Sequence, residues 1–441
     1  MVNSKSDASN TFDLIVVGGG SGGLSSAKRA ASHGARVALI ERDRLGGTCV
    51  NRGCVPKKLM WMTARQRIEA AEHYQMDIAN EPRIDFGQMQ TRITDHLVNL
   101  NSMFENQLSD AGITLVRGAA EISGIDDIRV NGTSYTTDKL LLATGARPKR
   151  LDIQGADLAD VSDDVFLWTR LPDTLVIIGG GYIGCEFASI LNALGVDVTL
   201  VNEDDRLLDQ FARSAGQLAK ENMQAQGVEM HLGVTPDRLE KKDDHLVTHL
   251  SDGTSLKSER ILLATGRQPN VDKLGSICKA LEVAKSGALA IDAEFTTSVK
   301  DVFAVGDSAD RLPLTPVATR DGTTFADQQF GPGATQVDLD KVPSAVFVYP
   351  PVAQVGTVPD DIELTYGDGL ASGVLKPEGH GCNAYAHHFV GDTLAGTTLV
   401  HASAAELIAP FGVLVKAAGS KAMLTKVTGV HPTFAEELLG R

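Results

Sequence analysis

The order of apolar and polar positions near the start of the chain predicts a strand, a glycine-rich turn, a helix and a second strand. An apolar run, Leu14–Val17, leads into the turn, and a helical pattern continues from Leu24. A second apolar run, Val37–Ile40, ends at the acidic residue Glu41. Short apolar runs next to a helical period are typical of a strand–helix–strand unit.

The glycines of this turn have the spacing of a dinucleotide-binding fingerprint. Gly18, Gly20 and Gly23 form GxGxxG directly after the first strand, and Glu41 follows about twenty residues later. Glycines at these positions let the backbone approach a pyrophosphate at the helix N-terminus, while the acid accepts a hydrogen bond from a ribose hydroxyl. The sequence therefore predicts one bound dinucleotide here.

The same unit recurs in TLVIIGGGYIGCEFASILNALGVDVTLVNEDD, where Gly179, Gly181 and Gly184 repeat the fingerprint. Each copy is followed by a second repeated segment, LLLATGARP at 140–148 and ILLATGRQP at 261–269. Internal repetition indicates two related domains, so the chain should bind two dinucleotides. The predicted fold class is α/β, with two Rossmann-like dinucleotide-binding domains.

The length of the chain bears on the number of domains, and its net charge and apolar runs bear on its partners and location. A chain of 441 residues suggests several domains. The net charge of −15 disfavours nucleic acid and anionic membranes as partners. Neither an apolar leader in the first ten residues nor a run of about eighteen apolar residues is present, so a cytoplasmic protein is expected.

The five cysteines do not form a dense disulfide framework. Cys49 and Cys54 lie close together in GGTCVNRGCVPKK, without the further His or Cys ligands that a zinc site requires, so no metal is expected. Two dinucleotides and a close cysteine pair favour electron transfer, because a dithiol accepts two electrons as a pair. Cys185, Cys278 and Cys382 are interpreted as structural.

Four motifs in order resemble the flavoprotein disulfide reductases, the class I pyridine nucleotide-disulfide oxidoreductases. They are GGTCVNRGCVPKK, the doubled fingerprint units, VFAVGDSADRLPLTPVA at 302–318 and the terminal HPTFAEELL at 431–439. The GCVPKK and LTPVA forms are most similar to glutathione reductase, including an NADH-preferring, glutathione amide reductase-like member. The resemblance runs from about residue 12 to the C-terminus.

The resemblance implies FAD and a nicotinamide cofactor, and it assigns residues to each. The FAD-binding set is Gly18, Gly20, Ser21, Gly23, Glu41, Thr48, Lys57, Gly145, Asp307 and Thr315. The second set is Gly179, Gly181, Tyr182, Gly184, Glu186, Asn202, Glu203 and Gly266. Lys57 would stabilise negative charge on the reduced flavin, paired with Glu186.

The resemblance also implies a mechanism and a homodimer. Electrons would open the Cys49–Cys54 disulfide, after which Cys49 attacks the substrate disulfide and Cys54, nearer the flavin, resolves the mixed disulfide. His431, oriented by Glu436, would serve as acid and base, because a neighbouring carboxylate favours the charged imidazole. In the family this histidine reaches the other subunit's cysteines, so an active site shared across a dimer is expected. The stretch 361–386 is shorter than expected for the family.

The residues after the second fingerprint predict a preference for NADH. In NADP-binding relatives two basic residues hold the 2′-phosphate, and here those positions are Glu203 and Asp209. Arg206 is the nearby cation, and Gly184 in place of alanine also favours NAD.

The substrate positions depart from glutathione reductase. Lys28 and Thr323 stand where two arginines would grip the carboxylates of the peptide, and Phe104 replaces a tyrosine. Ser21 and Arg29 are kept, and Glu437 completes the expected substrate set. Lysine lacks the planar fork of arginine and threonine lacks charge, so a small disulfide with fewer negative groups than glutathione disulfide is expected.

Two alternatives stay open. A lipoamide dehydrogenase would also use NAD, although GCVPKK and LTPVA argue against it. A non-catalytic flavoprotein that senses redox state is a further possibility, which the retained cysteines and His431 disfavour.

The expected architecture has four segments. They are an FAD-binding domain at 12–147, an NAD(P)-binding domain at 148–271, a central segment at 272–341 that completes the FAD domain, and an α+β dimerisation domain at 342–441. The expected function is maintenance of thiol redox balance by reduction of a glutathione-type disulfide.

Overall fold

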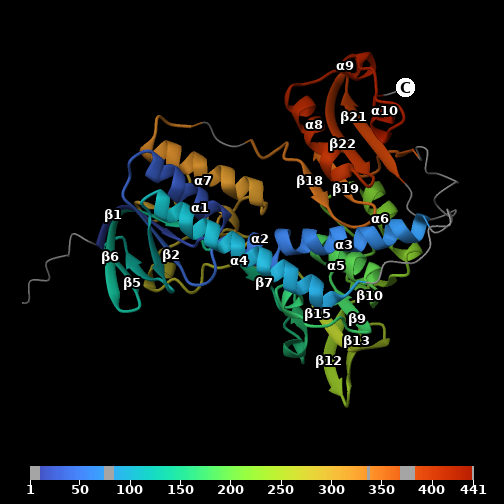
Figure 1. Ribbon diagram of the computed structural model, residues 1–441, viewed down its shortest axis with the longest axis horizontal. Helices are drawn as coiled ribbons and strands as arrows, with labels where there is room; N and C mark the ends of the chain where they lie inside the picture. The colour runs from blue at the N-terminus through green and yellow to red at the C-terminus, as the bar shows by residue number, and fades with distance from the viewer. Residues whose placement is uncertain (1–9, 74–83, 335–337, 368–382, 440–441) are drawn as a thin grey trace, which may run out of the picture. The chain divides into compact units, whose positions relative to one another are not determined.

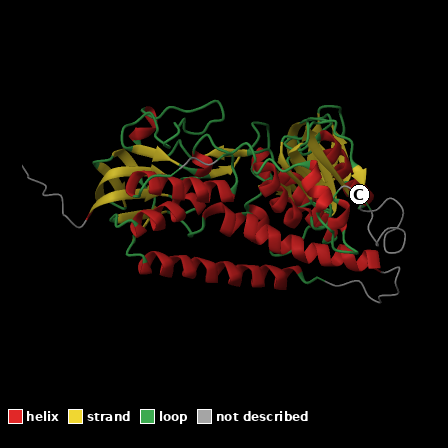
Figure 2. Ribbon diagram, turned by 90° about the horizontal axis from the view of Figure 1, so that it is seen from above, coloured by secondary structure: helices red, strands yellow, loops and turns green. Residues whose placement is uncertain are grey.

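The computed structural model describes residues 10–73, 84–334, 338–367 and 383–439, and it divides into two compact units. The first unit takes in the described residues within 1–57, 91–148 and 267–339, and the second those within 58–90, 149–266 and 340–441. The division falls inside two long helices, α3 (Cys54–His73) and α4 (Phe86–Asp110), drawn as the extended coils of Figure 2. The four expected segments stay a prediction.

The first unit contains a parallel sheet with antiparallel strands added at one side. Its helices, besides parts of α3 and α4, are α1 (Ser21–Ser32), α2 (Gly47–Arg52) and α7 (Thr315–Phe330). Its strands are β1 (Thr11–Val17), β2 (Val37–Glu41), β3 (Thr114–Arg117), β4 (Glu121–Gly124), β5 (Asp127–Val130), β6 (Thr133–Leu142), β7 (Ala146–Pro148), β16 (Arg267–Pro269) and β17 (Val302–Ala304).

The predicted first unit of strand, turn, helix and strand is present. Strands run in the order β3-β2-β1-β6-β5-β4, with β17 also paired to β6, and β1 is parallel to both β2 and β6. The apolar runs predicted as strands lie within β1 and β2. The helix begins at Ser21, three residues before the predicted start, because Gly22 and Gly23 already belong to its first turn.

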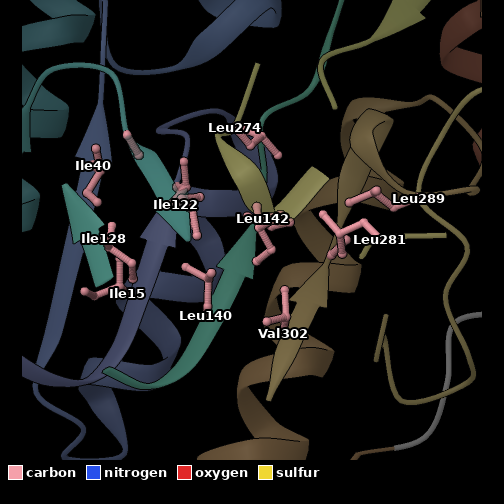
Figure 3. Packing of buried hydrophobic residues seen from close by; sticks show 14 of the residues in the cluster. Ile15, Ile40, Ile122, Ile128, Leu140, Leu142, Leu274, Leu281, Leu289 and Val302 are labelled. Carbon is pink, nitrogen blue, oxygen red and sulfur yellow. The ribbon is translucent and has the colours of Figure 1, made fainter. Parts of the chain in front are cut away.

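Strand β2 and the C-terminal ends of β1 and β6 are buried on both faces, which explains why these segments are apolar without alternation. Ile15, Ile40, Leu140 and Leu142 point into one cluster together with residues from 274 to 309, as Figure 3 shows. Their neighbours along the same strands, such as Leu14, Leu39 and Leu141, pack on the opposite face against α1 and α7. Helices α1 and α7 lie side by side in Figure 1 and contact each other closely.

The turn between β1 and α1 leaves no room for side chains. A Cβ atom on Gly23 would lie 1.9 Å from the carbonyl oxygen of Gly18, and one on Gly18 would lie 2.2 Å from the carbonyl oxygen of Ala143. Gly18 also has a φ of 110°, which side chains disfavour. The helix can therefore start directly behind the strand only with glycine at both positions.

The second unit repeats a parallel sheet and adds two antiparallel sheets. Its helices, besides parts of α3 and α4, are α5 (Tyr182–Ala193), α6 (Arg213–Ala225), α8 (Ala404–Lys416), α9 (Lys421–Lys426) and α10 (Phe434–Glu437). Its strands are β8 (Asp160–Val161), β9 (Thr174–Ile178), β10 (Asp197–Asn202), β11 (Glu229–Leu232), β12 (Pro236–Lys242), β13 (His245–Leu250), β14 (Ser255–Ser258), β15 (Arg260–Leu263), β18 (Ser344–Val346), β19 (Val352–Gly356), β20 (Thr365–Tyr366), β21 (Ala384–Val390) and β22 (Thr393–Val400).

The three sheets of the second unit separate along the chain. The parallel sheet has the order β11-β10-β9-β15-β8, and β12-β13-β14 form a small antiparallel sheet. The C-terminal part forms an antiparallel sheet, β18-β19-β22-β21-β20, against which α8 packs. This part has the expected α+β composition, and its role in dimerisation stays a prediction.

Two expectations fall partly or wholly outside the described residues. Cys382 lies there, as does most of the shortened stretch 361–386. Among the helices of the described residues, none is long and apolar enough to span a membrane.

The glycine turn generates a stability prediction. Gly23→Ala should lower the free energy of unfolding by about 3 kcal/mol, because the added methyl group overlaps a backbone carbonyl that cannot move away without shifting the helix. Urea unfolding followed by circular dichroism measures the change. Gly124→Ala is the matched control, since a Cβ there meets nothing within 4 Å. Equal midpoints for the two variants would contradict the steric argument.

Candidate functional site

The first fingerprint presents a helix N-terminus suited to an anion. Gly20 is the N-cap of α1, no side chain caps the helix, and no acidic residue lies in its first turn. The unpaired backbone N–H groups and the helix dipole favour a phosphate at such a position. Ser21 is the first helical residue. Gly145 has a φ of 64°, the left-handed conformation that glycine permits.

Glu41 holds the fingerprint turn from the end of β2. Its Oε2 accepts a hydrogen bond of 2.6 Å from the backbone N–H of Gly19, and its Oε1 accepts one of 2.7 Å from Asp43. Burial raises the pKa of the Glu41 carboxyl, and the Gly19 N–H opposes that rise. The residue expected at a ribose thus also fixes the loop that would surround the nucleotide.

The second fingerprint repeats this geometry. A Cβ on Gly184 would lie 1.9 Å from the carbonyl oxygen of Gly179, the same close approach as between Gly23 and Gly18. Gly181 is the N-cap of α5, again without a side-chain cap, and Tyr182 begins the helix. The structure therefore shows two similar candidate anion sites, one in each unit.

The carboxylate of the first copy is replaced by an amide in the second. Asn202, at the end of β10, accepts a hydrogen bond of 2.7 Å on its Oδ1 from the N–H of Gly180. Its Nδ2 donates to the carbonyl oxygens of Asp204 and Arg206, both at 3.1 Å. Asn202 therefore braces both the fingerprint turn and the loop that follows β10. Gly266, with a φ of 100°, matches Gly145.

The loop after β10 presents negative charge. Glu203, Asp204, Asp205 and Asp209 are exposed. The side chain of Arg206 is only 17% exposed, and its two Nη atoms each lie 2.9 Å from the Asp360 carboxylate. The guanidinium also donates to the carbonyl oxygens of Asp209 and Phe211. Arg206, the cation expected nearest to a 2′-phosphate, is thus already paired with Asp360.

The cysteine pair lies where two helices meet. Cys49 is in the short helix α2, and Cys54 is the first residue of α3. Both are free thiols, with Cys49 half-buried and Cys54 exposed. The hydrogen bond to Cys54, together with burial, raises the pKa of the Cys49 thiol, and a hydrogen bond to Thr315 opposes the rise.

A second helix begins at the thiols. The Sγ of Cys54 lies 3.6 Å from the Oγ1 of Thr315, which is the first residue of α7. No side chain caps α7, so its N-terminal dipole favours negative charge on the nearby sulfur atoms. Thr315 was expected in the cofactor set, and its contact with the cysteines was not predicted.

Arg267 is a candidate functional residue that the sequence analysis missed. Its Nη2 donates to the carbonyl oxygen of Ala146 at 2.6 Å and lies 3.4 Å from the Oγ1 of Thr48. Burial raises the pKa of the Asp307 carboxyl, and the charge of Arg267 opposes that rise. A signal was present, because Arg267 stands in the second ATGxxP repeat where the first has Ala146.

Three of the expected substrate residues of the first unit already have polar partners. Lys28 Nζ donates to Gln107 Oε1 at 2.9 Å, and Arg29 Nε lies 2.5 Å from the Asp327 carboxylate. Thr323 donates to the carbonyl oxygen of Arg320, and Phe104 packs partly buried against the core. Because helical residues seven apart share a face, Ser21 and Lys28 lie on one side of α1.

The expected residues His431, Glu436 and Glu186 lie in the second unit. His431 Nδ1 is 2.9 Å from Glu436 Oε1, and the His431 side chain is 80% exposed. Glu186 is buried and accepts a hydrogen bond of 2.9 Å from the N–H of Phe347. Its expected pairing with Lys57, which belongs to the other unit, stays a prediction. Nowhere in the described ranges do three metal-binding side chains cluster.

Comparison with known proteins agrees with these motifs. A family model described as pyridine nucleotide-disulphide oxidoreductase matches residues 12–322. The chain is 35% identical over 440 residues to the glutathione reductase of Burkholderia cepacia, covering 97% of this chain and 98% of that protein. It is 32% identical over 453 residues to the glutathione reductase of Nostoc sp., covering 97% and 98%.

A relative with a different name has a similar identity. The dihydrolipoyl dehydrogenase of Halobacterium salinarum is 32% identical over 454 residues, covering 98% of this chain and 95% of that protein. The family resemblance predicted from four motifs is confirmed. This chain belongs to the pyridine nucleotide-disulphide oxidoreductase family, the flavoprotein disulfide reductases.

Proposed function

We propose that the protein uses FAD and the Cys49–Cys54 pair to carry electrons from NADH to a low-molecular-weight disulfide of the glutathione type, and so maintains thiol redox balance. The observation that carries the proposal is the hydrogen-bonded thiol pair beside the N-terminus of α7, within the same unit as the first fingerprint. Paired thiols of this kind exchange with disulfides.

The residues of the first unit fit FAD. The side-chain-free turn at Gly18 and Gly23 would let the pyrophosphate reach the uncapped start of α1, with Glu41 toward the ribose. When bound, FAD would take two electrons from the nicotinamide and make them available to the cysteines. Thr48, Lys57 and Asp307 would complete its surroundings, and Arg267 joins them as a cation close to Thr48.

The cysteines would then reduce the substrate by thiol–disulfide exchange. The Cys49 thiolate attacks one sulfur of the substrate, the substrate S–S bond breaks, and His431 protonates the departing thiolate. The Cys54 thiolate would next attack the Cys49 sulfur, which breaks the mixed disulfide, releases the second half of the substrate as a thiolate that takes a proton from water, and restores the Cys49–Cys54 disulfide. A base is required because the pKa of the Cys49 thiol is raised.

The acidic loop supports NADH as the electron donor. Glu203 and Asp209 would repel the 2′-phosphate of NADPH, and Arg206 is held by Asp360. Asn202, whose Oδ1 accepts from Gly180, leaves no basic group at the end of β10.

The contacts of Lys28 and Arg29 support a substrate with fewer carboxylates than glutathione disulfide. Lys28 is bound to Gln107, and Asp327 neutralises Arg29, so both cations would have to exchange partners to hold a carboxylate. Glutathione disulfide amide is therefore the expected substrate chemistry. A dihydrolipoamide:NAD activity is the second candidate, favoured by the acidic loop and by the Halobacterium relative.

We infer a homodimer formed through residues 342–441, in which His431 serves the cysteines of the other copy. The exposed ring of His431, oriented through its Nδ1 by Glu436, has its Nε2 available to a group outside its own domain.

The first test combines an acceptor panel with a cysteine variant. The holoenzyme should oxidise NADH with glutathione disulfide amide, glutathione disulfide or lipoamide, with the amide giving the highest kcat/KM. Cys49→Ser should lower kcat at least about 10³-fold with every acceptor while NADH still bleaches the flavin, because only the exchange step is lost. Cys278→Ser is the control and should retain activity. Fastest turnover in the direction of dihydrolipoamide oxidation by NAD would instead support the second candidate.

The coenzyme preference gives a second test. The kcat/KM for NADH should exceed that for NADPH by about tenfold or more, and Glu203→Arg should reduce this ratio by about tenfold, since it exchanges repulsion of the phosphate for attraction. Asp237→Arg makes the same charge change at another exposed acid of the second unit and should leave the ratio unaltered. A wild-type preference for NADPH would show that the loop does not select the cofactor.

The raised pKa of Cys49 predicts a pH dependence. A raised thiol pKa means a smaller thiolate fraction at neutral pH, so alkylation of Cys49 without its base should depend on hydroxide. In reduced His431→Ala protein, labelling of Cys49 by iodoacetamide should still be rising above about pH 8.5, the ordinary thiol value. Mass spectrometry of the labelled peptide gives the rate. A plateau below that pH would mean that Cys49 ionises readily by itself.

A further inference from the structure

A cluster of aromatic rings packs against α10, the helix that carries Glu436. Tyr385, His387 and Phe389 alternate along β21 and therefore point to the same face of its sheet. The ring of His387 lies 5.0 Å from that of Phe411 on α8 and 5.5 Å from that of Tyr385. The side chains of Phe434 and Leu438 complete the core on this side.

His387 makes two hydrogen bonds, one to the C-terminal segment and one to the neighbouring strand β22 of its own sheet. Its Nε2 lies 2.9 Å from the carbonyl oxygen of Leu438, and its Nδ1 lies 3.0 Å from the Oγ1 of Thr397. A carbonyl only accepts, so the ring proton is on Nε2, and Nδ1 accepts from the Thr397 hydroxyl. Burial lowers the pKa of His387, which disfavours the charged ring, and the hydrogen bond to Leu438 opposes that shift.

Phe434 provides a second anchor. Its ring stacks on His401 with centroids 3.9 Å apart and an interplanar angle of 3°, and Tyr385 meets it edge-on at 6.1 Å. Gly367 has no room for a side chain, because a Cβ there would lie 1.8 Å from Glu437 Oε2 and 3.3 Å from the Phe434 ring. The ring is thus enclosed on several sides.

The helix itself is too short to hold its own geometry. Helix α10 contains four residues, and isolated helical turns are unstable because nucleation is unfavourable. Glu436 lies between the two anchors, Phe434 before it and Leu438 after it. The 2.9 Å contact between Glu436 and His431 therefore depends on how firmly these two residues are held.

We propose that His387 is a positioning residue for the reaction: through its hydrogen bond to Leu438, assisted by the stacking of His401 on Phe434, it sets the Glu436 carboxylate at the distance that orients His431. This inference rests on the proposed acid–base role of His431. Nothing in the substrate or the cofactor has to touch His387.

The test separates the two half-reactions. His387→Phe keeps an aromatic ring but removes the donor to Leu438, so kcat with the fastest acceptor of the panel should fall about tenfold. Flavin reduction by NADH should be unchanged, because it does not use His431. His387→Gln should recover most of the lost kcat, since its amide N–H is placed to donate to the same carbonyl. Amide hydrogen exchange of residues 430–439 should be faster in His387→Phe and restored in His387→Gln.

His388→Phe is the matched control. It removes a histidine from the same strand, but on the opposite face, where the Nδ1 of His388 bonds to the carbonyl oxygen of Thr357. It should leave both half-reactions unchanged. If His387→Phe does not fold, Phe434→Leu tests the second anchor in the same assay, with the same selective loss expected.

The outcomes distinguish this inference from the proposed function. Unchanged kcat in His387→Phe, or a loss of flavin reduction equal to the loss of kcat, would overturn the positioning role. His431→Ala is measured beside it. Full turnover of His431→Ala would overturn the acid–base role of His431 itself, and the inference with it, whereas its inactivity beside a fully active His387→Phe overturns the inference alone.

Discussion

The close approach of a helix start to the strand before it is the constraint on which the molecule is built. The third fingerprint glycine of each unit is Gly23 or Gly184. A Cβ atom added to either glycine would lie 1.9 Å from a backbone carbonyl oxygen. That contact fixes the direction in which α1 and α5 leave their sheets, and it directs their uncapped N-termini toward the ends of the strands. The two candidate nucleotide sites follow from it.

One difference in chemistry between these two sites lies at the end of the second strand of each unit. Glu41 and Asn202 occupy the same place, each accepting a hydrogen bond from the middle glycine of its turn. The amide of Asn202 can also donate, and it uses this ability to hold the loop that carries the acidic residues. The same backbone arrangement therefore carries a carboxylate, that of Glu41, in the first unit. In the second unit it carries an amide, that of Asn202, which holds an acidic loop in place.

The thiol pair combines opposing electrostatic effects. The shared hydrogen bond and burial raise the pKa of Cys49, while Thr315 and the start of α7 favour negative charge. In the proposed mechanism a proton acceptor would release the thiolate of Cys49, and His431 with Glu436 would take that role. The ring cluster around His387 gives this pair a fixed geometry at the end of the chain, where a four-residue helix alone would not.

Much of the candidate site could be predicted from the sequence because the motifs that indicate it are formed by residues close together in the chain. Glycine spacing, strand periodicity and the Cys49–Cys54 interval each depend on neighbours along the chain, so both fingerprints, the ends of β1 and β2 and the thiol pair were predicted. The start of α1 was placed three residues late, because glycine carries no helical pattern of its own.

Only the tertiary structure determined the contacts between residues that are far apart in the chain. The engagement of Arg206 by Asp360, of Arg29 by Asp327 and of Leu438 by His387 joins segments whose separation leaves no pattern in the sequence. The sequence determined which groups are present, since identity and spacing are local properties. The fold determined which of these charged and polar groups already have a partner, because pairing depends on the distance between the groups in space.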